Sequence, residues 1–354
     1  MQYDMHYYGC YALAVAAGIR PEDALIVATA SQYVDDHAYN DWILSDAQTG
    51  EGVLGIATAH HPFEAGVRAL ARLIDDDDSR LVWVPFHFLP GNEGVEFADR
   101  MIARADSAPA NQMLDFYLRP ETIAAHRDHA LHLMGISAHA YADTFSHYGF
   151  SGMPSPKNCV RTESIRVESQ HTQGFLAHLA ETTDSFKARW GEYPHLGHGS
   201  VLTYPDRPYL QWSFTYEDGT SSQRSNPESF LKACEKLYGR FREFASVYYG
   251  AAPPTTRNWD DLREVVAGVL GREGTADERC GYWLEAMSRG DWGEVPAPRP
   301  YDVENWNRIV EAFKSGSDAQ AFLQSDPYRF FVAAEYHRSF VLKRLLPEIG
   351  LLVA

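Results

Sequence analysis

Three residues of metal-binding types recur at four-residue intervals within the stretch 132–150, which reads HLMGISAHAYADTFSHYGF. In a helix, His139, Asp143 and His147 are displaced from one another by roughly 40° and about 6 Å along the axis, so they share one face. A lone His on a helix face is usually a core residue, but two imidazoles and a carboxylate in this row predict a divalent metal site. Because the row is about 12 Å long, Asp143 could also bridge two ions.

Small residues in the same stretch leave room for other segments to pack closely against this helix; they are Gly135, Ser137, Ala138, Ala140 and Ala142. Those segments must supply the remaining ligands. Metal-capable residues elsewhere in the chain form three pairs, Asp4 with His6, Asp35 with Asp36, and His198 with Asp206, and further candidates are His60, His61 and His87. Without a metal, the same residues have ordinary roles as helix caps, solvated helix ends and loop residues.

The composition limits the classes of partner. The 354 residues are 45% hydrophobic and carry a formal net charge of −17, without a cluster of Lys and Arg to offset it. This balance argues against bulk nucleic acid or an anionic membrane as a partner. No stretch approaches the ~20 apolar residues of a membrane span, and the N-terminus shows no signal-peptide pattern, so we expect a cytoplasmic protein without a membrane anchor.

The four cysteines lie far apart and form no CxxC pair, so we expect reduced, buried thiols rather than a zinc knuckle or a disulfide framework.

Pro, Gly and apolar periodicity predict an all-α fold, in which irregular loops fill 40–63 and 191–212 and helices cover 7–17, 21–36, 63–74, 95–106, 120–148, 227–249, 259–271, 276–289, 302–313 and 328–346. The metal-capable residues concentrate in the first two thirds of the chain, which predicts scaffold helices at the C-terminal end.

The motif HAYADTFSHYGFSG resembles the helix motif of the zinc-dependent phospholipase C superfamily, whose secreted members include single-strand-specific nucleases with three zinc ions. The chain is most similar to an uncharacterised bacterial branch, through DMHYYGCYALAVAAG, ASQYVDD, VPFHFLPG and GHGSVLTYPDRPYLQW. This resemblance implies a multi-helix bundle with long irregular loops that carry metal ligands. It covers about residues 3–230, so we expect a metal-binding domain at 1–230 and a helical extension at 231–354 packed on it, or one continuous domain.

Carried over to this chain, the resemblance makes Asp143 the bridge between two metals, with His139 and either Asp35 or Asp36 on the first. A loop histidine completes this first site, and the candidates are His60, His61 and His87. The resemblance also implies that Asp143 and Asp35 are the catalytic carboxylates. The second metal would be bound by His6, and the third by His147, His198 and Asp206.

Three departures from the family pattern leave alternatives open. Secreted members use a processed N-terminal amino group as a ligand, and Asp4 could substitute for it here. Three residues separate Asp143 from His147, where the family has five, and no second HxxxD/E motif accompanies His198. A site with two metals therefore stands beside a site with three.

The resemblance implies a hydrolase of a small phosphodiester, in which metal-activated hydroxide attacks phosphorus. A ligand set of His and carboxylate suits Zn²⁺, and Fe²⁺ and Mn²⁺ also accept it. Two other classes stay open on the same residues: a di-iron or Mn oxidase or oxygenase acting on a small molecule, and a non-catalytic interaction protein stapled by its metals.

Overall fold

A computed structural model describes residues 1–37, 43–45, 52–59, 79–168, 170–173, 176, 196–251, 253–255, 257–315 and 319–353. The predicted helix 63–74 and the candidate ligands His60 and His61 lie outside the described residues. Within the described residues, no helix combines the length and the apolar character that a bilayer crossing requires.

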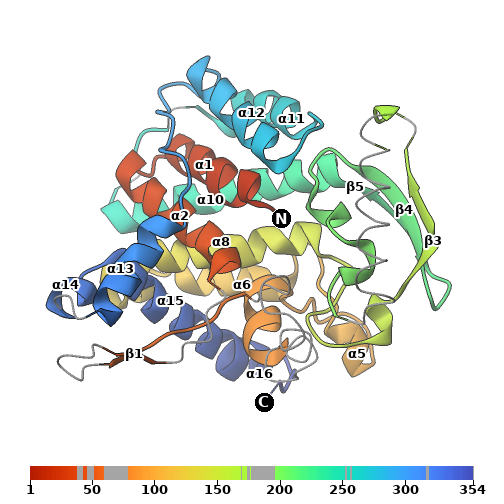
Figure 1. The fold of residues 1–354 in the computed structure, drawn as a ribbon, viewed down its shortest axis with the longest axis horizontal. Coiled ribbons are helices and arrows are strands. Elements are labelled where there is room, and N and C mark those ends of the chain that lie inside the picture. Colours follow the sequence, from red (N-terminus) through yellow and green to blue (C-terminus); the bar gives the residue numbers. More distant parts are fainter. Residues whose placement is uncertain are drawn as a thin grey trace.

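Helix α8, Ala130–Ser146, runs through the centre of the molecule and is buried along its whole length. The helices packed against it include α2 (Pro21–Asp36), α10 (Asn226–Tyr249) and α15 (Asp326–Phe340) (Figure 1). Every side of α8 therefore faces protein, which explains why its sequence is mostly apolar or small apart from His132 and the predicted metal-binding row.

The remaining helical segments surround this centre. They are η1 (Asp4–Gly9), α1 (Cys10–Ala16), η2 (Ser79–His87), α5 (Phe97–Arg100), α6 (Ala108–Tyr117), α7 (Pro120–Ala125), η3 (Arg127–His129), η4 (Pro156–Asn158), η5 (Gly199–Val201), η6 (Tyr204–Asp206), α11 (Trp259–Leu270), α12 (Ala276–Ser288), α13 (Glu304–Lys314), α14 (Ala319–Leu323), η7 (Val341–Leu345) and α16 (Leu346–Glu348). Local sequence signals determine where several of these helices begin. Pro21 is the first residue of α2, and Thr275 with Glu278 forms a capping box at the N-terminus of α12.

A small antiparallel sheet corrects the all-α prediction. It consists of β3 (Val160–Val167), β4 (Gln211–Tyr216) and β5 (Ser221–Ser225), in the order β3-β4-β5. Residues 43–45 and 52–54 pair as a further short hairpin, β1 (Ile43–Ser45) with β2 (Gly52–Leu54), inside the stretch predicted to be loop. The fold is thus mostly helical with a small sheet.

The sheet has its own small core, in which Trp212 and Phe214 point inward with Phe88 and Phe150. The alternation of these two aromatics with polar residues in QWSFTY is a strand signal. Strand β3 is harder to recognise because VRTESIRV is mostly polar.

One hydrophobic core extends from Met1 to Val353 and crosses residue 230 without a break. Phe230 and Phe241 of α10 and Phe330 of α15 belong to the same buried cluster as Tyr33 of α2. The C-terminal helices therefore share their packing with the helices that carry the predicted ligands.

Helices α2 and α8 approach each other closely at Gly135. A Cβ atom at this position would overlap the carbonyl oxygen of Val27 and lie 2.8 Å from the Cβ atom of Ala30. One helical turn further on, the carbonyl of Ser31 meets His139, so the close approach brings α2 within reach of the metal-binding row.

We predict that Gly135→Ala lowers the free energy of unfolding by about 1–3 kcal/mol, because the added methyl group forces the two helices apart. The matched control is Gly239→Ala in α10, where a Cβ atom meets nothing within 4 Å. This variant should gain about 0.5–1 kcal/mol from helix propensity alone. Urea unfolding of both variants measures the difference, and equal stabilities would contradict the packing argument.

Candidate metal centre

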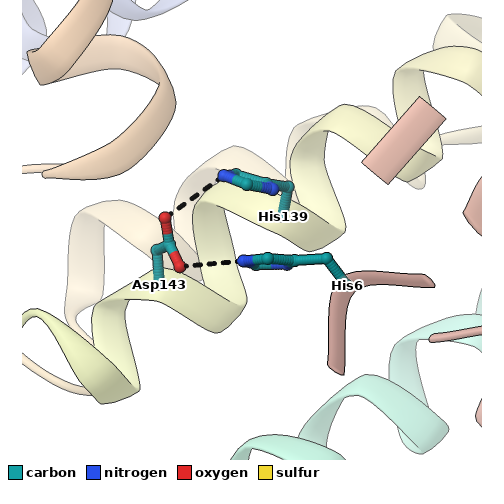
Figure 2. Close-up of side chains that lie close together, drawn as sticks. All are labelled: His6, His139 and Asp143. Atoms are coloured by element: carbon teal, nitrogen blue, oxygen red, sulfur yellow. Dashed lines mark ion pairs between the residues drawn. The ribbon is translucent and has the colours of Figure 1, made fainter. Parts of the chain in front are cut away.

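The N-terminal segment and η2 meet α8 at the carboxylate of Asp143. Its Oδ1 atom lies 2.5 Å from the α-amino nitrogen of Met1 and 3.2 Å from His6 Nε2. Its Oδ2 atom lies 3.2 Å from His139 Nε2 and 3.4 Å from His87 Nδ1. Figure 2 shows His6 and His139 approaching different oxygen atoms of this one carboxylate. Asp143 thus joins two sets of partners.

The first set adds Asp35, at the end of α2, to His87 and His139. The Asp35 Oδ1 atom lies 3.7 Å from His87 Nδ1 and 3.7 Å from His139 Nε2, and the two ring nitrogens lie 3.2 Å apart. These atoms are close enough together to hold one metal ion. Of the three histidines offered by the sequence for this position, His87 is the one within the described residues, and it lies in the cluster.

The second set contains His6, His139 and Asp143, whose ligand atoms also lie within reach of one ion. The His6 ring stacks on the His139 ring with centroids 3.9 Å apart, so both imidazoles present their edges to the carboxylate from the same side. The α-amino group of Met1 lies against the same Asp143 oxygen as His6.

The third set lies at the end of α8 and contains His147, His198 and Asp206. Asp206 Oδ1 lies 3.1 Å from His147 Nε2 and 3.2 Å from the Met1 nitrogen, and Asp206 Oδ2 lies 3.6 Å from His198 Nε2. The irregular loop after residue 196 therefore brings two predicted ligands to the helical row.

Four of these imidazoles are anchored in the same way, each by one ring nitrogen at a backbone carbonyl. The pairs are His139 Nδ1 with Ser31 (2.8 Å), His87 Nε2 with Thr58 (2.8 Å), His147 Nδ1 with His87 (2.9 Å) and His198 Nδ1 with Leu202 (2.6 Å). A carbonyl only accepts, so the anchored nitrogen carries the hydrogen and the other nitrogen of a neutral ring presents a lone pair. In all four cases that second nitrogen faces the cluster, as the outer-shell bonds of metal-binding histidines require.

A bound cation fits this donor set. Among the described residues, His6 Nε2 and Asp143 Oδ2 are buried atoms without a hydrogen-bond partner. In addition, the lone pairs of His87 Nδ1 and His139 Nε2 face each other and a carboxylate oxygen. Buried electron-rich atoms in such proximity repel unless a positive charge lies between them.

The protonation states suit metal ligands. Burial lowers the pKa of His6 and of His198 to about 4, and it holds the pKa of His139 well below its usual value. These rings are therefore neutral at neutral pH. Burial also opposes ionisation of Asp143, but His147 and the α-amino group outweigh it and hold the pKa of Asp143 well below its usual range.

Two other groups at the cluster, the Asp35 carboxyl and the α-amino group, have raised pKa values. Burial and the charge of Asp143 raise the pKa of Asp35 well above its usual value. Burial opposes the charge on the α-amino group, yet Asp143, Asp206 and Asp35 together raise its pKa to about 11. The ammonium group thus places a positive charge among the three carboxylates.

Two predicted ligands lie outside the cluster. Asp4, expected to replace the terminal amino group of the secreted proteins, instead pairs with Arg279, at 2.7 Å from its Nε atom. Asp36 points away from its neighbour Asp35 because it accepts hydrogen bonds from Tyr301 at 2.6 Å and from Gln32 at 3.1 Å. His61 lies outside the described residues.

Sequence reasoning missed two features of the cluster. The α-amino group of Met1 lies against Asp143 within the cluster, and Ser146 contacts that group at 3.2 Å. The family resemblance contains the signal for the amino group, because secreted members use theirs as a ligand. The carbonyls that anchor the rings leave no trace in the sequence because every residue has one.

Comparison with known proteins places the chain in a family without assigned function. No curated protein and no solved structure matches it. A family profile described as "Family of unknown function (DUF6765)" matches residues 1–345. This match covers nearly the whole chain, so the protein belongs to that family.

Proposed function

We propose that this protein is a metal-dependent hydrolase of a small phosphodiester, with up to three divalent cations around Asp143. The observation that carries the proposal is the shared orientation of four imidazoles, each anchored at a carbonyl by one nitrogen and facing the cluster with the other. Histidines that serve only the packing of a core can satisfy their hydrogen bonds in any orientation, whereas metal ligands must all point their free nitrogen at the same place.

The ligand assignment follows the three sets. Asp35, His87 and His139 would hold the first cation, and Asp143 would bridge it to the second through its two oxygens. His6 and the α-amino group would hold the second cation, and the third would lie among His147, His198 and Asp206.

The donor set favours Zn²⁺ over a di-iron centre. It combines five imidazoles with three aspartates, whereas di-iron carboxylate proteins on helical bundles use mainly glutamates with two histidines. The three ligand sets among the described residues contain no glutamate and no cysteine. Burial also raises the pKa of the Cys10 and Cys280 thiols to about 12, so neither side chain is a ready thiolate.

Two of the ligand side chains are partly exposed, which favours catalysis over a purely structural role. The Asp35 side chain is 30% exposed and that of His198 is 19% exposed, whereas Asp143 is 1% exposed. A structural metal site is closed by its protein ligands. A substrate could reach this cluster between Asp35 and His198.

The cations, Asp35 and Asp143 would have different roles in phosphodiester hydrolysis. Bound divalent cations would neutralise the phosphoryl oxygens and lower the pKa of water. Asp35, whose side chain is 30% exposed, would accept the proton of the attacking water. Asp143, buried and ionised, holds the two ligand sets together. The net charge of −17 favours a small substrate over a polyanion.

We predict that Asp143→Asn lowers the metal content of the purified protein by two equivalents, because one carboxylate serves two ligand sets. His198→Ala should remove one equivalent. The matched control is Asp36→Asn, next to Asp35 but turned away from the cluster, which should keep the wild-type content. Elemental analysis after dialysis gives the counts, and full occupancy in Asp143→Asn would refute the bridging role.

A two-residue extension before Met1 should lower the metal content and the affinity for Zn²⁺ by more than tenfold, because it converts the buried amino group into an amide without a lone pair on nitrogen. The same extension at the C-terminus serves as control. Isothermal titration with Zn²⁺ compares the two proteins. Unchanged binding by the N-terminally extended protein would show that the α-amino group is not a ligand.

Activity should appear when Zn²⁺-loaded protein meets a panel of phosphodiesters, from bis-p-nitrophenyl phosphate to phosphatidylcholine, under anaerobic conditions. A chelator should abolish turnover and added Zn²⁺ should restore it, without O₂ or a reductant. Asp35→Asn should lose at least 100-fold in rate, as a general base contributes about 10²–10⁴. An inactive Zn²⁺ protein, together with O₂ consumption by an iron-loaded sample, would overturn the hydrolase proposal.

A further inference from the structure

Helix α12, in the C-terminal third of the chain, holds the first nine residues in place. Resting on the proposed function, we infer that Arg279 of α12 is a positioning residue of the metal centre, which fixes Gln2 and Asp4 so that the Met1 amino group and His6 reach Asp143. Arg279 itself makes no contact with the three ligand sets that the structure brings together.

The Arg279 guanidinium makes four hydrogen bonds, to the N-terminal segment and to the residue before the N-cap of its own helix. Its Nε atom donates to Asp4 Oδ2 at 2.7 Å, and its Nη2 atom donates to Asp4 Oδ1 at 3.0 Å and to Gln2 Oε1. Its Nη1 atom donates to the Gly274 carbonyl at 2.9 Å. Such a two-point pair fixes orientation as well as distance.

Burial makes this pair specific. The side chains of Arg279 and Asp4 are 3% and 2% exposed. Either charge left alone in that environment would be strongly unfavourable, so Asp4 has one acceptable position in the fold. Asp4 lies between Met1 and His6 in the chain, and the pair therefore constrains both residues that meet Asp143 Oδ1.

The backbone transmits the constraint from Gln2 to His6. The carbonyl of Gln2 accepts hydrogen bonds from the amides of Met5 at 2.9 Å and His6 at 3.0 Å. Because Arg279 holds the Gln2 side chain and these bonds hold its carbonyl, a shift of Gln2 would carry the His6 backbone with it.

Two further contacts align η1 with α12 on either side of Arg279. The Tyr3 hydroxyl donates to Asp277, and Gly9 packs so closely on Trp283 that a Cβ atom would lie 3.1 Å from its ring. Arg279 and Trp283 are four residues apart and share one face of α12, and Asp277 lies in the first turn of the same helix. These contacts explain why a helix remote from the ligands in sequence is needed beside them.

The test uses metal-free protein and measures how fast an amine-reactive ester acylates the Met1 amino group, read by peptide mass spectrometry. Arg279→Met should raise this rate at least tenfold, because the N-terminus leaves Asp143. Arg279→Lys, which keeps the charge but not the two-point geometry, should fall between wild type and Arg279→Met. The matched control, Arg289→Met, removes an exposed ion pair with Glu285 at the end of the same helix and should leave the rate unchanged.

Arg279→Met leaves Asp4 unpaired and could unfold the protein, so the double variant Asp4→Asn/Arg279→Met repeats the measurement without a buried charge. Circular dichroism selects the folded variants. If the folded double variant protects its amino group as well as wild type does, the positioning role of Arg279 is refuted.

A second readout links the rate to the metal centre. On Zn²⁺ loading, the double variant should lose about one equivalent and keep the others, since His6 and the α-amino group would hold only the second cation. Wild-type protein that binds no Zn²⁺ would contradict the proposed function, whereas the acylation rates decide on Arg279 by themselves. A double variant with wild-type acylation and full Zn²⁺ content counts against the inference.

Discussion

The buried carboxylate of Asp143 is the interaction on which the rest of this site depends. Its two oxygens meet different partners: an ammonium group and His6 on one side, His139 and His87 on the other. A carboxylate in such a place stays ionised only because positive or polarisable groups surround it on all sides. The N-terminal segment, η2 and α8 itself bring those groups together near the C-terminal end of α8.

Packing and chemistry are coupled through small residues and buried pairs. The absence of a side chain at Gly135 lets α2 approach α8, which places the Ser31 carbonyl against His139. On the opposite side, Arg279 and Asp4 hold the N-terminal segment. Both devices lie outside the ligand sets, yet each determines where a ligand atom lies, so mutations well away from the metal ligands should alter metal affinity.

Much of this arrangement could be predicted from the sequence, for reasons visible in particular residues. The spacing of His139, Asp143 and His147 is local and survives folding, and Pro21 and Gly18 bound helices as expected. The strands were missed because β3 is polar, and the pairing of Asp4 could not be foreseen because its partner Arg279 is 275 residues away. Nothing local distinguishes Asp35 from Asp36; the Tyr301 hydroxyl makes the choice. Long-range pairs of this kind are invisible to spacing arguments.

The most direct test of the account is a crystal structure of the Zn²⁺-loaded protein with data collected on both sides of the zinc absorption edge. The account predicts anomalous peaks within bonding distance of both Asp143 oxygens, roughly 2.0–2.2 Å, and a further peak among His147, His198 and Asp206. Zinc bound only at surface histidines, with the Met1 ammonium still paired to Asp143, would contradict it.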